Sequence, residues 1–236
     1  MLRDLIDRIT GTQPAPSWQA ALVLGVAALA LTWTPAGHRV TRHLTTLVHE
    51  AGHAAVALLA GRRLTGIRLH SDTSGLTVSR GRPRGPGMIA TLAAGYPAPA
   101  IVGLAGAWLL DAGHAAAALW ALVGLCAVML LLIRNLYGLW LVVAVGAGVA
   151  ALSWYASGPV LTGAAYLVVW ALLLAAPRAV VDLQRQRRRA RAGASDADQL
   201  ARLTHLPAAV WVGAFWLVCA AALVLGAIRL VPVGAG

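Results

Sequence analysis

Three closely spaced residues carry the clearest chemistry in the sequence. His49, Glu50 and His53 form an HExxH pattern inside an apolar run. On a helix, residues four positions apart lie on one face, so both imidazoles can bind one metal ion, and imidazole nitrogens are typical zinc ligands. The carboxylate between them is placed to take a proton from metal-bound water. The pattern therefore predicts that His49 and His53 bind Zn2+ and that Glu50 is the catalytic base of a hydrolase.

A purely structural role for these residues is the main alternative. The three side chains could form a satisfied polar cluster inside a helix bundle. However, an ionisable residue in a membrane-spanning segment costs at least ~2.5 kcal/mol, and such residues are functional by default. Glu50 is also the only glutamate in the chain. A catalytic role is therefore favoured.

The composition indicates a protein that lies in a membrane. The chain has 236 residues, of which 59% are hydrophobic and 11% are charged, and these values fall outside the range of ordinary soluble domains. Each of its apolar segments is long enough to cross a hydrocarbon core of about 30 Å. The segments lie near residues 18–34, 40–60, 87–110, 115–133, 138–154, 159–176 and 207–229. We expect an all-α polytopic membrane protein with about six to seven transmembrane helices, forming a single integral membrane domain over residues 1–236.

The charge pattern predicts which segments lie in the cytoplasm. All 19 Lys and Arg residues are arginines, and they concentrate in a basic hairpin loop at 61–86 and in a basic segment at 178–206. Such loops favour the cytoplasmic side, where they contact anionic lipid headgroups of the bilayer, so no nucleic acid is expected as a partner. The all-arginine, alanine-rich composition indicates a high-GC coding sequence and hence a bacterial inner membrane. Residues 1–16 begin with an amphipathic stretch and are expected to form an interfacial helix.

A short β-hairpin is expected inside the basic loop that follows the HExxH helix. Ile67 and Leu69 alternate with polar residues, a turn-forming Ser-Asp-Thr-Ser-Gly sequence follows, and Leu76 and Val78 resume the alternation. The edge of such a hairpin can hold an extended substrate segment as an added strand. Proline placed within Leu64–Leu69 is then expected to reduce cleavage.

The motif and its surroundings resemble a known family. The sequence HEAGH at 49–53 in a transmembrane segment, followed by a polar hairpin, resembles the site-2-type intramembrane zinc metalloproteases, the M50 group, and more closely its M50B-like bacterial branch. The likeness continues in Ala94-Gly95-Tyr96, in residues 134–138 and in Ser195-Asp196-Ala197. It implies a zinc protease that cuts membrane-anchored protein substrates within or beside the bilayer. The better-known members take their third zinc ligand from an Asp-Gly after an Asn-Pro element, which this chain lacks; Asn135 lies near that place, but an amide is a poor zinc ligand.

A catalytic zinc site needs a third protein ligand and an open position. Asp182, Asp196 and Asp198 remain once the aspartates of the surface helix, the hairpin turn and the far-side loop are set aside. Ser195 to Asp198 also fits a capping box, which explains Asp198 better than Asp196. Asp182 lies in the arginine run, where an ion pair suits it. We therefore expect Asp196 to be the third zinc ligand, with Asp198 and Asn135 as open alternatives.

Two residues are candidates for substrate binding. Arg134 and Asn135 are expected at the same membrane face as Asp196, where Arg134 can hold a scissile carbonyl or an oxyanion, although an arginine at a helix end more often extends toward the headgroups. A different class of function stays open: an M50-like membrane protein without catalysis that binds partners or moves a metal ion. The missing Asn-Pro and Asp-Gly element favours that alternative, whereas the intact Glu50 favours the enzyme.

Overall fold

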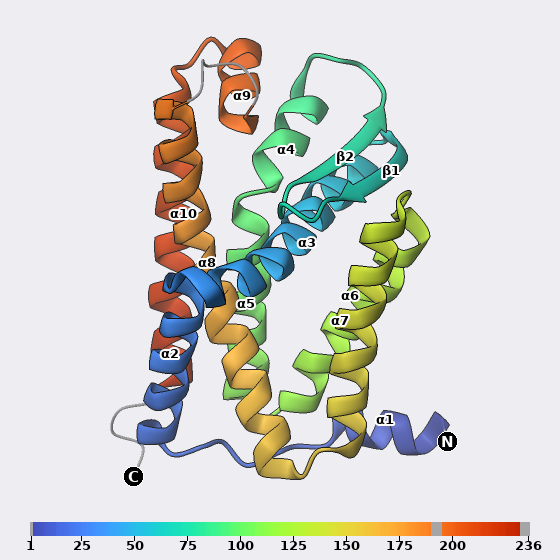
Figure 1. Cartoon of the computed structure of the whole chain (residues 1–236), viewed down its shortest axis with the longest axis vertical. Coiled ribbons are helices and arrows are strands. Elements are labelled where there is room, and N and C mark those ends of the chain that lie inside the picture. Colours follow the sequence, from blue (N-terminus) through green and yellow to red (C-terminus); the bar gives the residue numbers. More distant parts are fainter. Residues whose placement is uncertain (1, 190–194, 232–236) are drawn as a thin grey trace.

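The computed structural model describes residues 2–189 and 195–231, which form a helical bundle with one two-stranded hairpin (Figure 1). In chain order the elements are α1 (Leu2–Thr10), α2 (Trp18–Trp33), α3 (Pro35–Leu59), β1 (Arg63–Leu69), β2 (Gly75–Arg80), α4 (Pro86–Ala94), α5 (Pro97–Asp111), α6 (Ala115–Leu132), α7 (Leu136–Tyr155), α8 (Gly158–Arg189), α9 (Asp196–Thr204) and α10 (Ala208–Leu230). The predicted class, an all-α polytopic membrane protein with a short hairpin after the HExxH helix, is confirmed.

The number of membrane spans depends on two bent helix pairs. In the described part of the chain, 4 helices are each long and apolar enough to cross a membrane, namely α6, α7, α8 and α10. The pairs α2 with α3 and α4 with α5 pass the same test together, which gives up to 6 spans if each pair is one span. The apolar segments predicted at 18–34 and 40–60 correspond to α2 and α3, which pass this test together as one bent pair.

The bend between α2 and α3 measures 93°, and two residues at the start of α3 accommodate it. Pro35 begins α3, and proline suits the first turn of a helix but cannot continue a preceding one. Gly37 packs against the end of α2 so closely that a Cβ atom there would lie 2.3 Å from the carbonyl oxygen of Leu31. As a result α3 crosses the bundle obliquely and carries the HExxH residues into its interior (Figure 1).

The hairpin packs against α3 and shows the predicted alternation. Its strands pair antiparallel, with Ile67 opposite Thr77. Ile67 is 0% exposed in the interior, whereas Leu76 on the other face is 51% exposed. One face of the hairpin therefore belongs to a core formed with α3, α6 and α7.

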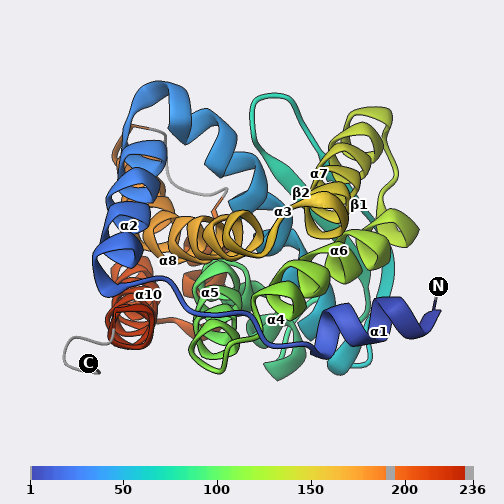
Figure 2. The ribbon, with the colours of Figure 1, turned by 90° about the horizontal axis from the view of Figure 1, so that it is seen from below.

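The two basic segments share one end of the molecule. The hairpin, the start of α4 and α9 lie at that end, and α9 packs against α4 (Figure 1). At the opposite end lies α1, and the segment after it crosses beneath α5, where Gln13 bonds to Gly113 and Ala116 (Figure 2). Residues 190–194 of the basic segment lie outside the described residues. The arrangement agrees with the predicted clustering of charge, while the cytoplasmic location of this end and the interfacial location of α1 stay predictions.

Candidate metal centre

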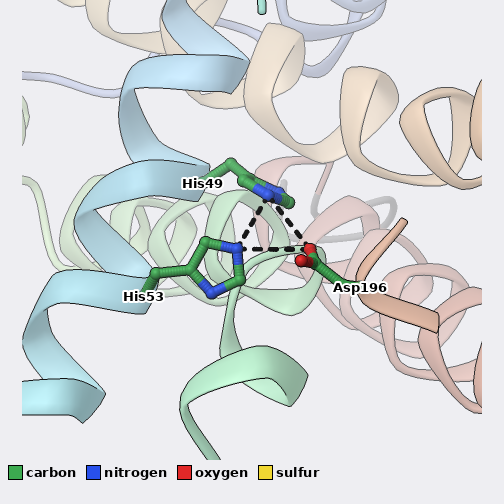
Figure 3. A group of neighbouring side chains, drawn as sticks. All are labelled: His49, His53 and Asp196. Atoms are coloured by element: carbon green, nitrogen blue, oxygen red, sulfur yellow. Dashed lines mark hydrogen bonds and ion pairs between the residues drawn. The ribbon is translucent and has the colours of Figure 1, made fainter. Parts of the chain in front are cut away.

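Three side chains from distant parts of the sequence converge on one point (Figure 3). The Nε2 atoms of His49 and His53 are 3.0 Å apart, and Oδ2 of Asp196 lies 3.4 Å from the first and 3.2 Å from the second. His49 and His53 come from adjacent turns of α3, and Asp196 opens α9. The structure therefore brings Asp196, the expected third ligand, together with both histidines, while its binding of zinc stays a prediction.

A backbone carbonyl of α4 orients the His53 ring. Nδ1 of His53 donates a hydrogen bond to the carbonyl oxygen of Thr91 at 2.7 Å. With the proton on Nδ1, the lone pair of Nε2 points toward His49 and Asp196. Metal-binding histidines are commonly held in this way, because the outer hydrogen bond selects the tautomer and fixes the ring.

The break between α4 and α5 makes room for the two rings. Gly95 lies in this break, where the helices bend by 63°. A Cβ atom on Gly95 would lie 2.4 Å from Nε2 of His53 and 2.6 Å from Cε1 of His49. Its φ of −61° suits any residue, so glycine is required here by space and not by backbone conformation. The Tyr96 ring follows and contacts His49 edge-on, with the ring centroids 4.8 Å apart.

Replacing Gly95 by alanine is expected to disturb the metal centre with little effect on the bundle. The added methyl group overlaps both imidazoles, so at least one ring must move away from Asp196. We expect zinc affinity to fall by about tenfold or more, as when a ligand loses its orientation. A Gly124→Ala variant is the matched control, since a Cβ atom at Gly124 meets nothing within 4 Å. Equal zinc affinity of the two variants in a chelator competition would contradict this account of Gly95.

A short helix outside the spans presents Asp196. Ser195 caps α9, and Asp198 completes the capping box, so the predicted box and the predicted ligand occur together on one turn. Asp198 also accepts a hydrogen bond from Nε of Arg187 at 2.9 Å, which ties α9 to the end of α8. Burial alone would raise the pKa of Asp196, but the His49 and His53 imidazoles outweigh it when their Nε2 atoms carry protons and donate to the carboxylate, and they then hold its pKa well below the usual range.

Glu50 lies beside the three converging side chains and is not one of them. The Thr77 hydroxyl on β2 donates a hydrogen bond to its Oε2 atom at 2.5 Å. The strand comes so close that a Cβ atom on Gly75 would lie 2.4 Å from Oε1 of Glu50. The Glu50 carboxylate is thus held against the hairpin, and Oε1 has no hydrogen bond within the described part of the chain.

The centre opens into a cavity of about 540 Å³ between α3, the hairpin, α4, α8 and α9. His49, Glu50, His53 and Asp196 all line it. Thr77 and Thr91 line it too, although the sequence alone did not single them out. A hydroxyl or a carbonyl in this role has no signature in a single sequence.

Arg134 and Asn135 do not line this cavity. The Asn135 side chain donates to the carbonyl oxygen of Leu69 at 2.7 Å and accepts from the Leu69 amide at 3.2 Å. The Arg134 guanidinium donates to the carbonyl oxygens of Leu131 and Ile133. The Asn135 side chain therefore joins the start of α7 to β1, whereas the Arg134 side chain closes the end of α6, and the assignment of both residues to substrate binding stays a prediction. The expected ion pairing of Asp182 is present, with Arg178 and Arg185 at 3.8 and 3.5 Å.

Comparison with known proteins gives a match at the level of a family. The family model described as Peptidase M50B-like matches residues 22–226. No curated protein and no solved structure matches the chain. The matched range runs from α2 into α10 and contains every residue of the candidate centre. This multi-pass membrane protein therefore belongs to the Peptidase M50B-like family, as the resemblance of its HExxH segment predicted.

Proposed function

We propose that the protein is a zinc-dependent endopeptidase that cleaves membrane-anchored proteins within or beside the bilayer. The observation that carries this proposal is the meeting of His49, His53 and Asp196 with Glu50 beside them in one cavity. Membership of a peptidase family supports it and does not favour the alternative of a non-catalytic protein. A bacterial inner membrane is the proposed location, because the use of arginine in place of lysine throughout the chain indicates a high-GC coding sequence.

The donor set fits zinc in kind and in spacing. Tetrahedral zinc with bonds of about 2.0–2.1 Å separates its ligand atoms by about 3.3 Å, and the separations here are 3.0, 3.2 and 3.4 Å. Two imidazoles and one carboxylate are also a set found in catalytic zinc sites, which keep a fourth position open. When bound, zinc supplies Lewis-acid chemistry, since it lowers the pKa of a bound water toward neutrality and polarises a carbonyl oxygen.

Glu50 is the residue that moves the proton in this proposal. Its Oε2 atom is engaged by Thr77, which leaves Oε1 to accept a proton from the attacking water and to pass it to the leaving amine. His53 cannot take this role, because its Nδ1 atom is bonded to Thr91 and its Nε2 atom faces His49 and Asp196. The base and the metal ligands are thus separate groups.

The outer edge of β2 is the proposed binding place for the substrate backbone. A peptide in a membrane hides its amides in a helix, so cleavage requires an unwound segment whose backbone groups find new partners. The outer edge of β1 is occupied, since Ile67 accepts from the Arg134 amide at 2.9 Å and Leu69 pairs with Asn135. This pairing shows that Ile67 and Leu69 point their backbone groups away from β2. Their partners on β2, Thr77 and Gly75, then point theirs away from β1.

Because the outer edge of β1 is occupied, we expect proline to reduce cleavage when it is placed on β2 and not when it is placed within Leu64–Leu69. Ser79 follows Thr77 by two positions, so its amide also points outward. We expect Ser79→Pro to reduce cleavage by about fivefold, the worth of one hydrogen bond of about 1 kcal/mol, without loss of zinc. Ser79→Ala is the matched control, because it removes the hydroxyl that Arg62 bonds and keeps the amide. Equal cleavage by the two variants would mean that no substrate strand adds at this position.

The proposed function is tested with purified protein in liposomes that also hold single-span model substrates. We expect zinc bound in a stoichiometric amount and proteolytic fragments that disappear with a chelator and return with added zinc. Zinc-loaded protein that leaves every substrate intact, over a set varied in sequence around the membrane boundary, would contradict the endopeptidase and leave a non-catalytic role.

A further inference from the structure

One face of α3 lines the length of the cavity and extends well beyond the metal ligands. His38, Arg42, Thr45 and His49 follow one another at helical spacing, and all four line the cavity. Arg42 stands two turns before His49, a separation of about 10 Å along the helix axis. It is half-buried and also lines a second, smaller cavity beside the hairpin turn, together with Arg39 and Asp72.

The charges of the cavity are paired with one exception. Asp182 has ion pairs with Arg178 and Arg185, and Arg187 is paired with Asp198. The two remaining acids, Glu50 and Asp196, are engaged by Thr77 and by the imidazoles respectively. Among the described residues that line the cavity, Arg42 alone is a charged residue with neither a hydrogen bond nor an ion pair.

Asp72, which lines the smaller cavity with Arg42, attracts its charge from a distance but forms no ion pair with it. Asp72 lies in the hairpin turn, and its Oδ1 atom accepts from the amide of Ser74 at 2.9 Å and from the Ser74 hydroxyl at 2.6 Å. None of the Arg42 nitrogens is a buried atom without a partner among the described residues, and Arg42 lines both cavities, so a ligand that enters the larger cavity can reach it. An ionisable residue without a partner in a helix that takes part in a membrane span is costly, and such residues commonly mark ligand sites.

We propose that Arg42 binds a carboxylate side chain of the substrate about three residues away from the scissile peptide bond. The inference rests on the proposed function and deepens it. A guanidinium presents two parallel donors that match a carboxylate. About 10 Å along α3 corresponds to about three residues of an extended chain at roughly 3.3 Å each.

The contacts between the hairpin and α3 support this spacing between the scissile bond and the bound carboxylate. The Thr46 hydroxyl donates to the carbonyl oxygen of Thr73, and the Thr77 hydroxyl donates to Glu50. From Thr73 to Thr77 the hairpin thus advances along α3 in the same direction as from Thr46 to Glu50. An extended segment added beside β2 therefore follows α3 as well, and it passes Arg42 at the end where Thr73 lies. Arg42 is thus a specificity residue and takes no part in bond cleavage.

The test uses blocked, quenched peptides of alanine, leucine and glycine that carry one aspartate, moved from four residues before to four residues after the expected cleavage point. Each is paired with the asparagine peptide. Binding is measured by fluorescence anisotropy on the Glu50→Gln variant, and kcat/KM is measured on the otherwise native enzyme. At one position we expect the aspartate peptide to bind about tenfold tighter than its asparagine partner. Adding Arg42→Gln should erase that preference, and adding Arg42→Glu should transfer it to a lysine peptide.

Arg39→Gln is the matched control, because Arg39 lies on the same helix, is exposed and lines only the smaller cavity. The proposal is overturned if aspartate and asparagine peptides bind equally at every position. It is also overturned if Arg39→Gln and Arg42→Gln have the same effect, which would indicate a general attraction of anions or of lipid headgroups. Peptides that bind with the expected preference to Glu50→Gln but are never cut by the zinc-loaded native enzyme would uphold Arg42 and contradict the proposed function.

Discussion

Replacement of Glu50 by glutamine is expected to abolish cleavage and to leave zinc binding unchanged. Glutamine keeps the shape of the side chain and can still accept the Thr77 hydrogen bond, but it cannot take a proton from water. Loss of a general base typically lowers kcat by about 10²–10⁴-fold. Zinc content should stay at the native level, because Glu50 is outside the group formed by His49, His53 and Asp196. Zinc analysis and cleavage assays on the same preparations measure both quantities.

Thr77→Val is the companion variant, since it keeps the carboxylate and removes only the hydroxyl bonded to it. We expect a smaller fall in kcat than for Glu50→Gln, because Glu50 remains a base but loses the contact that orients it. A Glu50→Gln protein that loses zinc would show that Glu50 is itself a ligand. A Glu50→Gln protein that cleaves normally would show that another group moves the proton.

The parts of the molecule that sequence could predict are those governed by local periodicity. His49 and His53 share a face because any α-helix brings positions i and i+4 together. Ile67 and Leu76 fall on opposite faces of the hairpin because side chains alternate along a strand. The capping box at Ser195 likewise depends only on neighbouring residues. For these features the interactions that decide the structure lie within a few positions along the chain.

The bend between α2 and α3 shows where local patterns stop being sufficient. Pro35 indicates that a helix begins, but the same proline is compatible with two separate spans joined by a turn. Gly37 permits the close approach to Leu31 at this angle, but α3 also packs against α4, α5 and α8, so the angle depends on the rest of the bundle. With α3 bent in this way, Arg39 and Arg42 lie beside the hairpin turn.

Asn135 illustrates a partner that sequence cannot identify. Its side chain carries a donor and an acceptor in the arrangement of a peptide group, so it can extend a sheet as a strand would. The partner is Leu69, which is 66 positions away along the chain. An asparagine near a catalytic motif suggests a ligand or a substrate contact, whereas the Asn135 amide here completes the edge of β1.

Replacement of Asp196 by asparagine is expected to reduce zinc affinity by more than about 100-fold, since loss of an outer hydrogen-bond partner alone typically costs about 10–100-fold. Asn is isosteric with Asp, so α9 keeps its cap, and the buried Ala197 and Leu200, each 0% exposed, still anchor the helix. The neutral amide is a poor zinc ligand and no longer balances the charge of the metal. Competition with a chromophoric chelator gives the affinity, and the absorption spectrum of the cobalt form reports whether the number of ligands has changed.

Asp198 offers a control on the same turn of α9, with the same chemical change. Asp198→Asn weakens the capping box and the ion pair with Arg187, so it loosens α9 without removing a donor from the metal centre. We expect zinc affinity to fall less than about tenfold in this variant, below the usual cost of an outer partner, with the cobalt spectrum unchanged. If both variants lose zinc equally, the contribution of α9 is only to close the cavity. If Asp198→Asn loses more zinc than Asp196→Asn, the third ligand is Asp198. Only a loss specific to Asp196 is consistent with direct coordination by its carboxylate, because the two aspartates share the first turn of the same helix.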